Sequence, residues 1–183
     1  MPFGIEKIGV YPCSFSLEMK RLCEARKHDL ADIRDTMMID ERSVNPAWED
    51  PVTMAVKEYR LPDPDARPRR IAITADDMVW YTDFARGYLG RLNPATGEVK
   101  EWRSPSGTSS EPYGIAVAKG ALWYNESGPR PNTLVRFDPA TQTFQSWLVP
   151  SGGVVIRNMM TTRDGNLAIA SSGANKVGVV EIK

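Results

Sequence analysis

The residues of this chain with the clearest chemical potential are two glutamates, Glu111 and Glu126, which lie fifteen residues apart. Each flanks a short run of alternating apolar residues, and strands of this kind can carry both carboxylates to one rim of a sheet. Two carboxylates at one rim offer the oxygen ligands that a hard cation such as Mg²⁺ prefers. Tyr113, two residues after Glu111, is the third candidate. The alternative is that both glutamates are solvated strand-end residues, or are paired with Arg130 or Arg136.

Histidine and cysteine, which carry much enzyme chemistry, are scarce in this chain. The only histidine is His28, which we interpret as an exposed residue at a helix end or in a loop. Cys13 and Cys23 lack the spacing of zinc ligands, and we interpret them as reduced thiols in a packed segment. The candidate chemistry therefore depends on the two carboxylates and the tyrosine.

The candidate residues lie in a segment that repeats with a period of about 44 residues. The first copy runs from Arg67 to Trp102, the second from Glu111 to Trp147, and a weaker third copy begins at Val155. A period of about 40 to 50 residues that holds several short alternating strands is typical of β-propeller blades. We therefore predict a mainly β fold: an incomplete β-propeller of about three four-stranded blades over residues 57–183, preceded by a small α/β segment over residues 1–56.

Within each copy, the pattern assigns a role to each strand. Alternating Ile and Val residues predict the inner strand, and an aromatic pair predicts the strand beside it. An Asx-Pro-Ala-Thr turn then leads to an outer strand that ends in tryptophan, with Val56 to Leu61 as a stray outer strand ahead of the first copy. Tryptophans recur at matching positions, which favours packing between blades over catalysis (Trp80, Trp102, Trp123, Trp147).

Three blades are too few for a closed ring, because propellers close with about four to eight blades. The free blade faces and strand edges would then need covering, by the preceding segment or by another copy of the chain. We therefore expect self-association through exposed blade faces.

Residues 1–56 carry no trace of the repeat. Gly4-Ile-Glu-Lys-Ile-Gly-Val-Tyr11 and Glu49-Asp-Pro-Val-Thr-Met-Ala-Val56 resemble the opening of hydroxymethylglutaryl-CoA synthases. The catalytic cysteine, glutamate and histidine of that family lie downstream of its opening segment, so the resemblance implies no activity here. The change of pattern near Val56 indicates a fusion, a rearrangement or an assembly artefact.

The repeats resemble the streptogramin B lyase (virginiamycin B lyase) family. The motifs that carry the resemblance are Leu89-Gly-Arg-Leu-Asn-Pro-Ala-Thr-Gly97, Glu111-Pro-Tyr-Gly114 and Leu122-Trp-Tyr-Asn-Glu126. That family opens a cyclic depsipeptide antibiotic by elimination and uses Mg²⁺. The resemblance implies functional roles for Glu111 and Glu126, including the binding of the metal.

The chain departs from the family pattern at the histidine. Tyr113 stands where the family motif Glu-Pro-His-Gly has histidine, and Asn158 stands where the related Arg-His-Met motif has it. A phenol, which ionises near pH ~10, is a poor base at neutral pH. The resemblance therefore implies an impaired carbon-oxygen lyase with Tyr113 in the catalytic position.

The composition of the chain limits the classes of binding partner that it favours. The 23 basic and 23 acidic residues cancel, so the charge favours neither nucleic acid nor an anionic membrane. No apolar run reaches the roughly 20 residues of a transmembrane helix, and the opening residues lack the features of a signal peptide, so we expect a cytoplasmic protein.

Three functions remain open at this point. The first is a lyase-like propeller fragment acting on a cyclic peptide or small-molecule ligand. The second is a non-catalytic propeller module that binds a peptide or protein partner. The third is a fused or truncated reading frame without its own activity.

Overall fold

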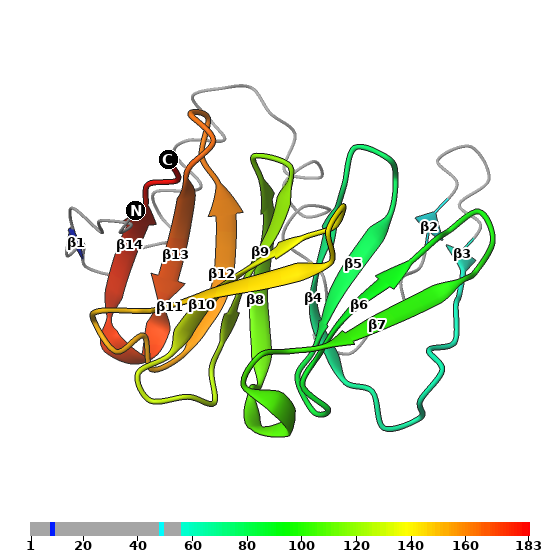
Figure 1. The fold of residues 1–183 in the computed structure, drawn as a ribbon, viewed down its shortest axis with the longest axis horizontal. Helices are drawn as coiled ribbons and strands as arrows, with labels where there is room; N and C mark the ends of the chain where they lie inside the picture. Colours follow the sequence, from blue (N-terminus) through cyan, green and yellow to red (C-terminus); the bar gives the residue numbers. More distant parts are fainter. Residues whose placement is uncertain (1–7, 10–47, 50–55) are drawn as a thin grey trace.

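A computed structural model of the chain describes residues 8–9, 48–49 and 56–183 (Figure 1). Most of the small α/β segment predicted over residues 1–56, which contains the synthase-like motifs, lies outside these residues. Within the described part of the chain, the fold is almost entirely β, with two short 3₁₀ turns at Gly107–Ser109 and Ser172–Ala174. No helix there is long and apolar enough to cross a membrane.

Three antiparallel sheets follow one another along the chain. Blade 1 contains β4 (Pro68–Ile73), β5 (Val79–Asp83), β6 (Tyr88–Leu92) and β7 (Val99–Arg103). Blade 2 contains β8 (Pro112–Ala118), β9 (Ala121–Glu126), β10 (Thr133–Asp138) and β11 (Thr143–Leu148). Blade 3 contains β12 (Ile156–Thr161), β13 (Leu167–Ser171) and β14 (Lys176–Val180), with β1 (Ile8–Gly9) beside β14. The prediction of about three blades is confirmed.

The sheets lie side by side through their inner strands. β8 lies between β4 and β12, so the inner strands of the three sheets are neighbours (Figure 1). Each sheet is a meander in which every strand pairs with the next one in the sequence. The starts of β4, β8 and β12 therefore lie at the same end of the molecule.

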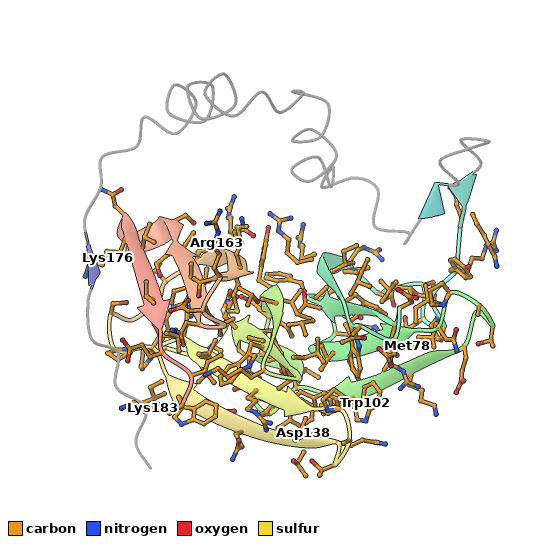
Figure 2. All side chains as sticks on the ribbon, turned by 90° about the horizontal axis from the view of Figure 1, so that it is seen from above. Met78, Trp102, Asp138, Arg163, Lys176 and Lys183 are labelled. Carbon is orange, nitrogen blue, oxygen red and sulfur yellow. The ribbon has the colours of Figure 1, made fainter. Side chains whose placement is uncertain are left out.

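The tryptophans fill the space between and within blades, as the repeat predicts. Trp102 stacks on Trp80 with ring centroids 5.4 Å apart, and it also contacts Phe137 of blade 2 at 5.1 Å. Trp147 stacks on Trp123 at 5.7 Å and packs against the core that blades 2 and 3 share. Figure 2 labels Trp102, on the outer strand β7 of blade 1, and Asp138, at the end of β10 in blade 2.

The turns between the third and fourth strands also follow the sequence prediction. Asn93 Oδ1 accepts hydrogen bonds from the backbone N–H groups of Ala95 (2.9 Å) and Thr96 (3.4 Å). Asp138 Oδ1 does the same for Ala140 (3.0 Å) and Thr141 (3.3 Å). These backbone donors lower the pKa of the Asp138 carboxyl.

The free face of blade 1 is partly covered by the segment that precedes it in the sequence, which resembles an outer strand. Val56-Lys-Glu-Tyr-Arg-Leu-Pro62 matches Val99-Lys-Glu-Trp-Arg-Ser-Pro105, the outer strand of blade 1. The regular strand β3 (Val56–Lys57) is short and pairs with β2 (Trp48–Glu49). Tyr59 nevertheless packs on Val79 and Leu92 of blade 1, as Trp102 packs on blade 2.

Blade 3 differs from blade 1 at its outward face. Met160 is 61% exposed, Val177 48% and Val179 43%. Met160 and Val179 lie in cross-strand register with the half-buried Ala168, so the three residues form one apolar row with exposed ends. This row is the free blade face that the sequence predicts.

Candidate functional site

A β-bulge recurs at the start of each inner strand. The pairing register shifts between Pro68 and Ile71 in β4, between Pro112 and Ile115 in β8, and between Ile156 and Asn158 in β12. A bulge redirects the side chains beside it. The residues at the three bulges correspond to one another in the repeat (Arg69, Tyr113, Arg157).

These three residues line one cavity of about 290 Å³, which we call the mouth cavity. All three blades contribute to its wall: Arg69 and Phe84; Glu111, Tyr113, Ser127 and Arg130; and Val154, Val155 and Arg157. Propeller ligands gather where the inner strands of several blades meet, and this cavity lies at such a place. It is therefore the candidate functional site.

Glu111 lies at the wall of the mouth cavity. Its backbone adopts the left-handed conformation, with φ 49°, and its carbonyl accepts a hydrogen bond from the Ser127 N–H at 3.0 Å. That bond joins the loop before β8 to the end of β9. The left-handed conformation costs a non-glycine residue about 1 kcal/mol, so the surrounding blade holds Glu111 in place.

Glu126, the second predicted site residue, is fully buried and does not line the mouth cavity. Its carboxylate accepts hydrogen bonds from Ser104 Oγ (2.6 Å), Ser106 N (2.9 Å), Ser106 Oγ (2.6 Å) and Thr133 Oγ1 (2.5 Å). Ser104 and Ser106 come from the loop between blades 1 and 2. The structure therefore does not bring the two glutamates together at the cavity wall, and Glu126 joins a blade to the loop that precedes it.

Asp83 is the blade 1 counterpart of Glu126 and is also fully buried. Its carboxylate accepts hydrogen bonds from the Arg67 N–H at 2.9 Å and from Arg86 Nε at 2.6 Å. A buried acidic residue at this position is therefore part of the blade structure in both copies, although different groups donate hydrogen bonds to it in each.

Tyr113 is 7% exposed, and its ring packs edge-on against Phe84 with centroids 5.8 Å apart. Two guanidinium groups lie over its ring, those of Arg69 at 5.9 Å and Arg70 at 5.5 Å. The Thr82 hydroxyl donates to the Tyr113 carbonyl at 2.6 Å and fixes the backbone from the neighbouring blade. Tyr113 is thus held in a cationic and aromatic environment.

The third copy brings an arginine and an asparagine to the same end. Arg157 is exposed and lines the mouth cavity. The adjacent Asn158 Oδ1 accepts a hydrogen bond from the Met159 N–H at 3.1 Å. Neither side chain supplies an imidazole base.

The described residues do not make a resident Mg²⁺ site. No group of three or more His, Cys, Asp or Glu side chains gathers anywhere in the described ranges. Glu111 is the single carboxylate in the wall of the mouth cavity, where three arginines accompany it. A hard dication prefers several anionic oxygen ligands, so this donor set does not fit it.

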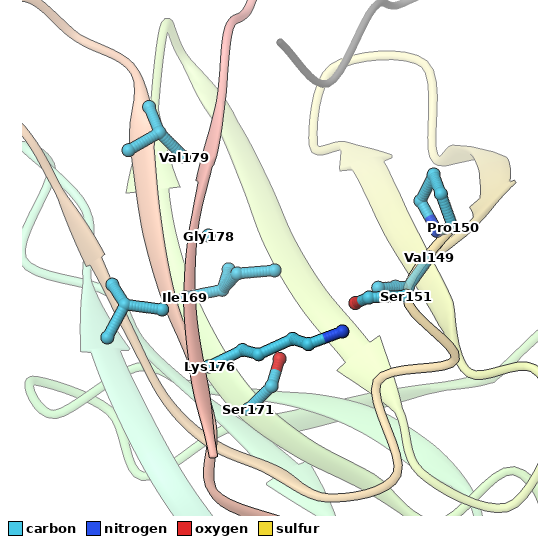
Figure 3. Close-up of a pocket in the computed structure, with 9 residues that line it drawn as sticks. Val149, Pro150, Ser151, Ile169, Ser171, Lys176, Gly178 and Val179 are labelled. Carbon is cyan, nitrogen blue, oxygen red and sulfur yellow. The ribbon is translucent and has the colours of Figure 1, made fainter. Parts of the chain in front are cut away.

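A second hollow, shown in Figure 3, lies between β13, β14 and the segment after β11. Its volume is only about 10 Å³, and its walls are mainly apolar, including Val149 and Ile169. A space of that size holds at most one water molecule. It is a packing defect between β14 and the segment after β11.

Comparison with known proteins decides the family. The virginiamycin B lyase family matches residues 50–183, which is most of the chain. The chain belongs to the virginiamycin B lyase family. The match begins at residue 50, a few residues before the predicted boundary at residue 57. No curated protein matches the sequence.

Solved structures of virginiamycin B lyases share the fold. A streptogramin B lyase structure superposes with a TM-score of 0.63 at 23% identity, covering 72% of this chain and 42% of that chain. Selenomethionine-substituted virginiamycin B lyase from Staphylococcus aureus gives 0.63 and 23%, covering 70% of this chain and 43% of that chain. A catalytically inactive form of the S. aureus enzyme with quinupristin gives 0.62 and 23%, covering 69% and 42%. The chain therefore spans less than half the length of these virginiamycin B lyases.

No comparison matches the synthase-like pattern, so the resemblance of residues 1–56 and the interpretation of a fusion stay predictions. The virginiamycin B lyase family pattern pointed to Glu111 and Tyr113, but not to the arginines and Phe84 around them. Arg69 and Arg157 could have been found by aligning the three copies at the Pro68, Pro112 and Ile156 positions. No sequence pattern indicated Ser104 and Ser106, because their role depends on how the loop between blades 1 and 2 packs against Glu126.

Proposed function

We propose that this protein is a lyase-family propeller module that binds a peptide-like ligand at the mouth cavity and has impaired elimination chemistry. The observation that supports this proposal is the wall of the cavity. Three blades line it, and Tyr113, which the sequence resemblance aligns with the histidine of the family motif, is part of that wall. Quinupristin, the ligand present in the S. aureus lyase structure, is a cyclic depsipeptide and represents the ligand class that we propose.

Ring opening by elimination requires a base near an acidic C–H group and a positive charge near the leaving carboxylate. In the mouth cavity the arginines can supply the positive charge, and Glu111 is the available carboxylate base. The Tyr113 hydroxyl is a hydrogen-bond donor and orients a ligand carbonyl. The family resemblance implies Mg²⁺, but the donor set of the mouth cavity does not fit that ion, so the proposed chemistry depends on Glu111, Tyr113 and the arginines alone.

We assign different roles to the two glutamates. Glu111 is proposed to contact the ligand, whereas Glu126 positions the loop that carries Ser104 and Ser106. The hydrogen bonds of Glu126 leave it no cavity-facing role within the described residues. A Mg²⁺ ion bridged by both glutamates is therefore not part of the proposal.

The test compares binding and ring opening of quinupristin by the full chain, with and without Mg²⁺. We expect measurable binding and little ring opening by the wild-type protein. Tyr113→His should raise ring opening by at least about tenfold, because it restores an imidazole base of suitable pKa. Glu111→Gln should abolish that gain.

Glu98→Gln is the matched control for charge, since Glu98 is exposed in the turn before β7, far from the mouth cavity, and pairs only with Lys100. It should change neither binding nor turnover. Absence of quinupristin binding to well-folded protein would refute the cyclic-ligand proposal, and fast ring opening by the wild type would refute the impairment.

A non-catalytic module that binds a linear peptide is the second candidate. The positive charge of the cavity wall favours it, because a streptogramin ring closed by an ester lacks the carboxylate that its opening would release.

A further inference from the structure

The arginines of the mouth cavity lack the ion pairs that Arg86 and Arg136 make. Elsewhere Arg86 pairs with Asp83 (2.6 Å), and Arg136 pairs with Asp138 (3.2 Å). Arg69, Arg130 and Arg157 make no ion pair with any described carboxylate, and Arg130 donates only to the backbone carbonyls of residues 127–129. Three positive groups therefore face a cavity that holds one carboxylate, Glu111.

Arg69 is the best-fixed of these cations. Its guanidinium lies 5.0 Å from the Phe84 ring centroid and 5.9 Å from that of Tyr113. Its Nε atom is buried and has no hydrogen-bond partner among the described residues. A buried donor without a partner costs about 1–3 kcal/mol, and an anionic ligand that reaches this group would recover part of that cost. The aromatic contacts keep the guanidinium in place before the ligand arrives.

Apolar side chains form one part of the wall. Phe84 and the Tyr113 ring lie beside Arg69, and Val154 and Val155 face them from the loop before β12. Val154 is 41% exposed and has a positive φ of 55°. A ligand that fits this wall carries an anionic group next to an aromatic or large apolar group.

We propose that the mouth cavity recognises the free C-terminal carboxylate of a linear peptide whose last residue is aromatic or large and apolar. This inference rests on the proposed peptide-binding function and specifies its ligand. Arg69 and Arg157, from blades 1 and 3, bind the carboxylate through charge-assisted hydrogen bonds. The terminal side chain packs on Phe84 and the valines. An intact ester ring offers no carboxylate, so the opened acid binds better than the ring.

The test uses the full chain and two probes, acetyl-Ala-Phe with a free carboxylate and the same peptide with a C-terminal amide. Calorimetry gives the affinities, and NMR of the arginine Nε–H groups reports where the probes bind. We expect the acid to bind about tenfold tighter than the amide or more, the size of a charge-assisted hydrogen bond. Added salt should weaken the binding of the acid alone.

Substitutions of the arginines distinguish the contribution of the ligand's carboxylate to binding from that of its apolar side chain. Arg69→Gln and Arg157→Gln should each weaken acid binding by about tenfold and change amide binding by less than about twofold. Arg157 is exposed, so its variant carries little risk of misfolding. Arg163→Gln is the matched control, because Arg163 is exposed in the turn between β12 and β13, at the other end of β12 from Arg157. It should change neither affinity.

Glu111→Gln gives the test a change of opposite direction. Removing the one negative group of the wall should leave acid binding unchanged or make it tighter. If the acid binds only with Mg²⁺ and Glu111→Gln abolishes that binding, a metal holds the carboxylate and the inference is wrong.

The remaining outcomes separate the two proposals. Equal affinities for acid and amide overturn the carboxylate inference but leave peptide binding intact. Binding of quinupristin without binding of either linear probe overturns the inference and keeps the cyclic-ligand function. Binding of none of the three ligands overturns both.

Discussion

At the scale of single residues, Glu111 and Glu126 show that similar side chains in adjacent motifs have different surroundings. Glu126 is fully buried, and serine and threonine hydroxyls and a backbone N–H surround its carboxylate. Glu111 lines the mouth cavity in a left-handed backbone conformation. The same family pattern therefore contains one residue that holds the fold and one that is open to a ligand.

Glu126→Ala should destabilise the protein by about 2–4 kcal/mol, because it leaves the buried hydroxyls of Ser104 and Thr133 and the donors of the exposed Ser106 without this acceptor. Glu126→Gln should cost less, since the amide oxygen keeps part of the network. Denaturant unfolding measures both changes.

Glu111→Gln is the comparison for this prediction and should shift stability by less than about 0.5 kcal/mol. Equal costs for the Glu111 and Glu126 variants would contradict the division of roles between them.

At the scale of elements, Gly90 in β6 shows how tightly a blade is packed. A Cβ atom there would lie 2.0 Å from Tyr81 Cζ, since the Tyr81 ring covers this glycine. The Tyr81 hydroxyl then reaches Glu101 Oε1 at 2.9 Å on the outer strand β7. Burial and the negative charge of Glu101 raise the pKa of Tyr81 above its ordinary value, so the phenol stays neutral.

Gly90→Ala should destabilise the protein by about 2–3 kcal/mol, since the tyrosine ring must move and lose its partner. Gly178→Ala, at the corresponding position of blade 3, is the control. Its Cβ would meet Ile169 Cγ1 at 3.0 Å, and this flexible side chain can move away. Thermal unfolding of both variants provides the comparison, and an equal loss would show that the tyrosine is not the cause.

The elements could be predicted from the sequence because their signals are local. Alternating residues set the strands, and the Asx-Pro turns at Asn93 and Asp138 set the hairpins. The mouth cavity could not be predicted in full, because Arg69, Phe84 and Arg157 meet there only through the side-by-side packing of three blades. The fully bonded state of Glu126 likewise depends on a loop from the adjacent blade.

At the scale of the whole molecule, the ends of the blade array differ. Tyr59 packs on the free face of blade 1, whereas blade 3 presents the apolar row of Met160, Ala168 and Val179. An apolar sheet face open to water favours association. Self-association through this face therefore remains our proposal for the chain in solution.

Val179→Lys should shift the chain toward the monomer, because it places a charge at the β14 end of the apolar row. Sedimentation velocity over a range of concentrations measures the shift. Leu148→Lys is the control, since Leu148 is 64% exposed but lies on β11, away from that face. A wild-type chain that stays monomeric at every concentration would refute the association.

The three bulges at the inner-strand starts have a consequence for how this protein family can diversify. Each bulge places one side chain in the wall of the mouth cavity. Arginine, tyrosine and arginine stand at these points, and the exposed Arg157 is the one whose exchange should affect the strand behind it least. Point mutations at these three positions can therefore change which ligand the mouth cavity binds, while the fold of the blades stays the same.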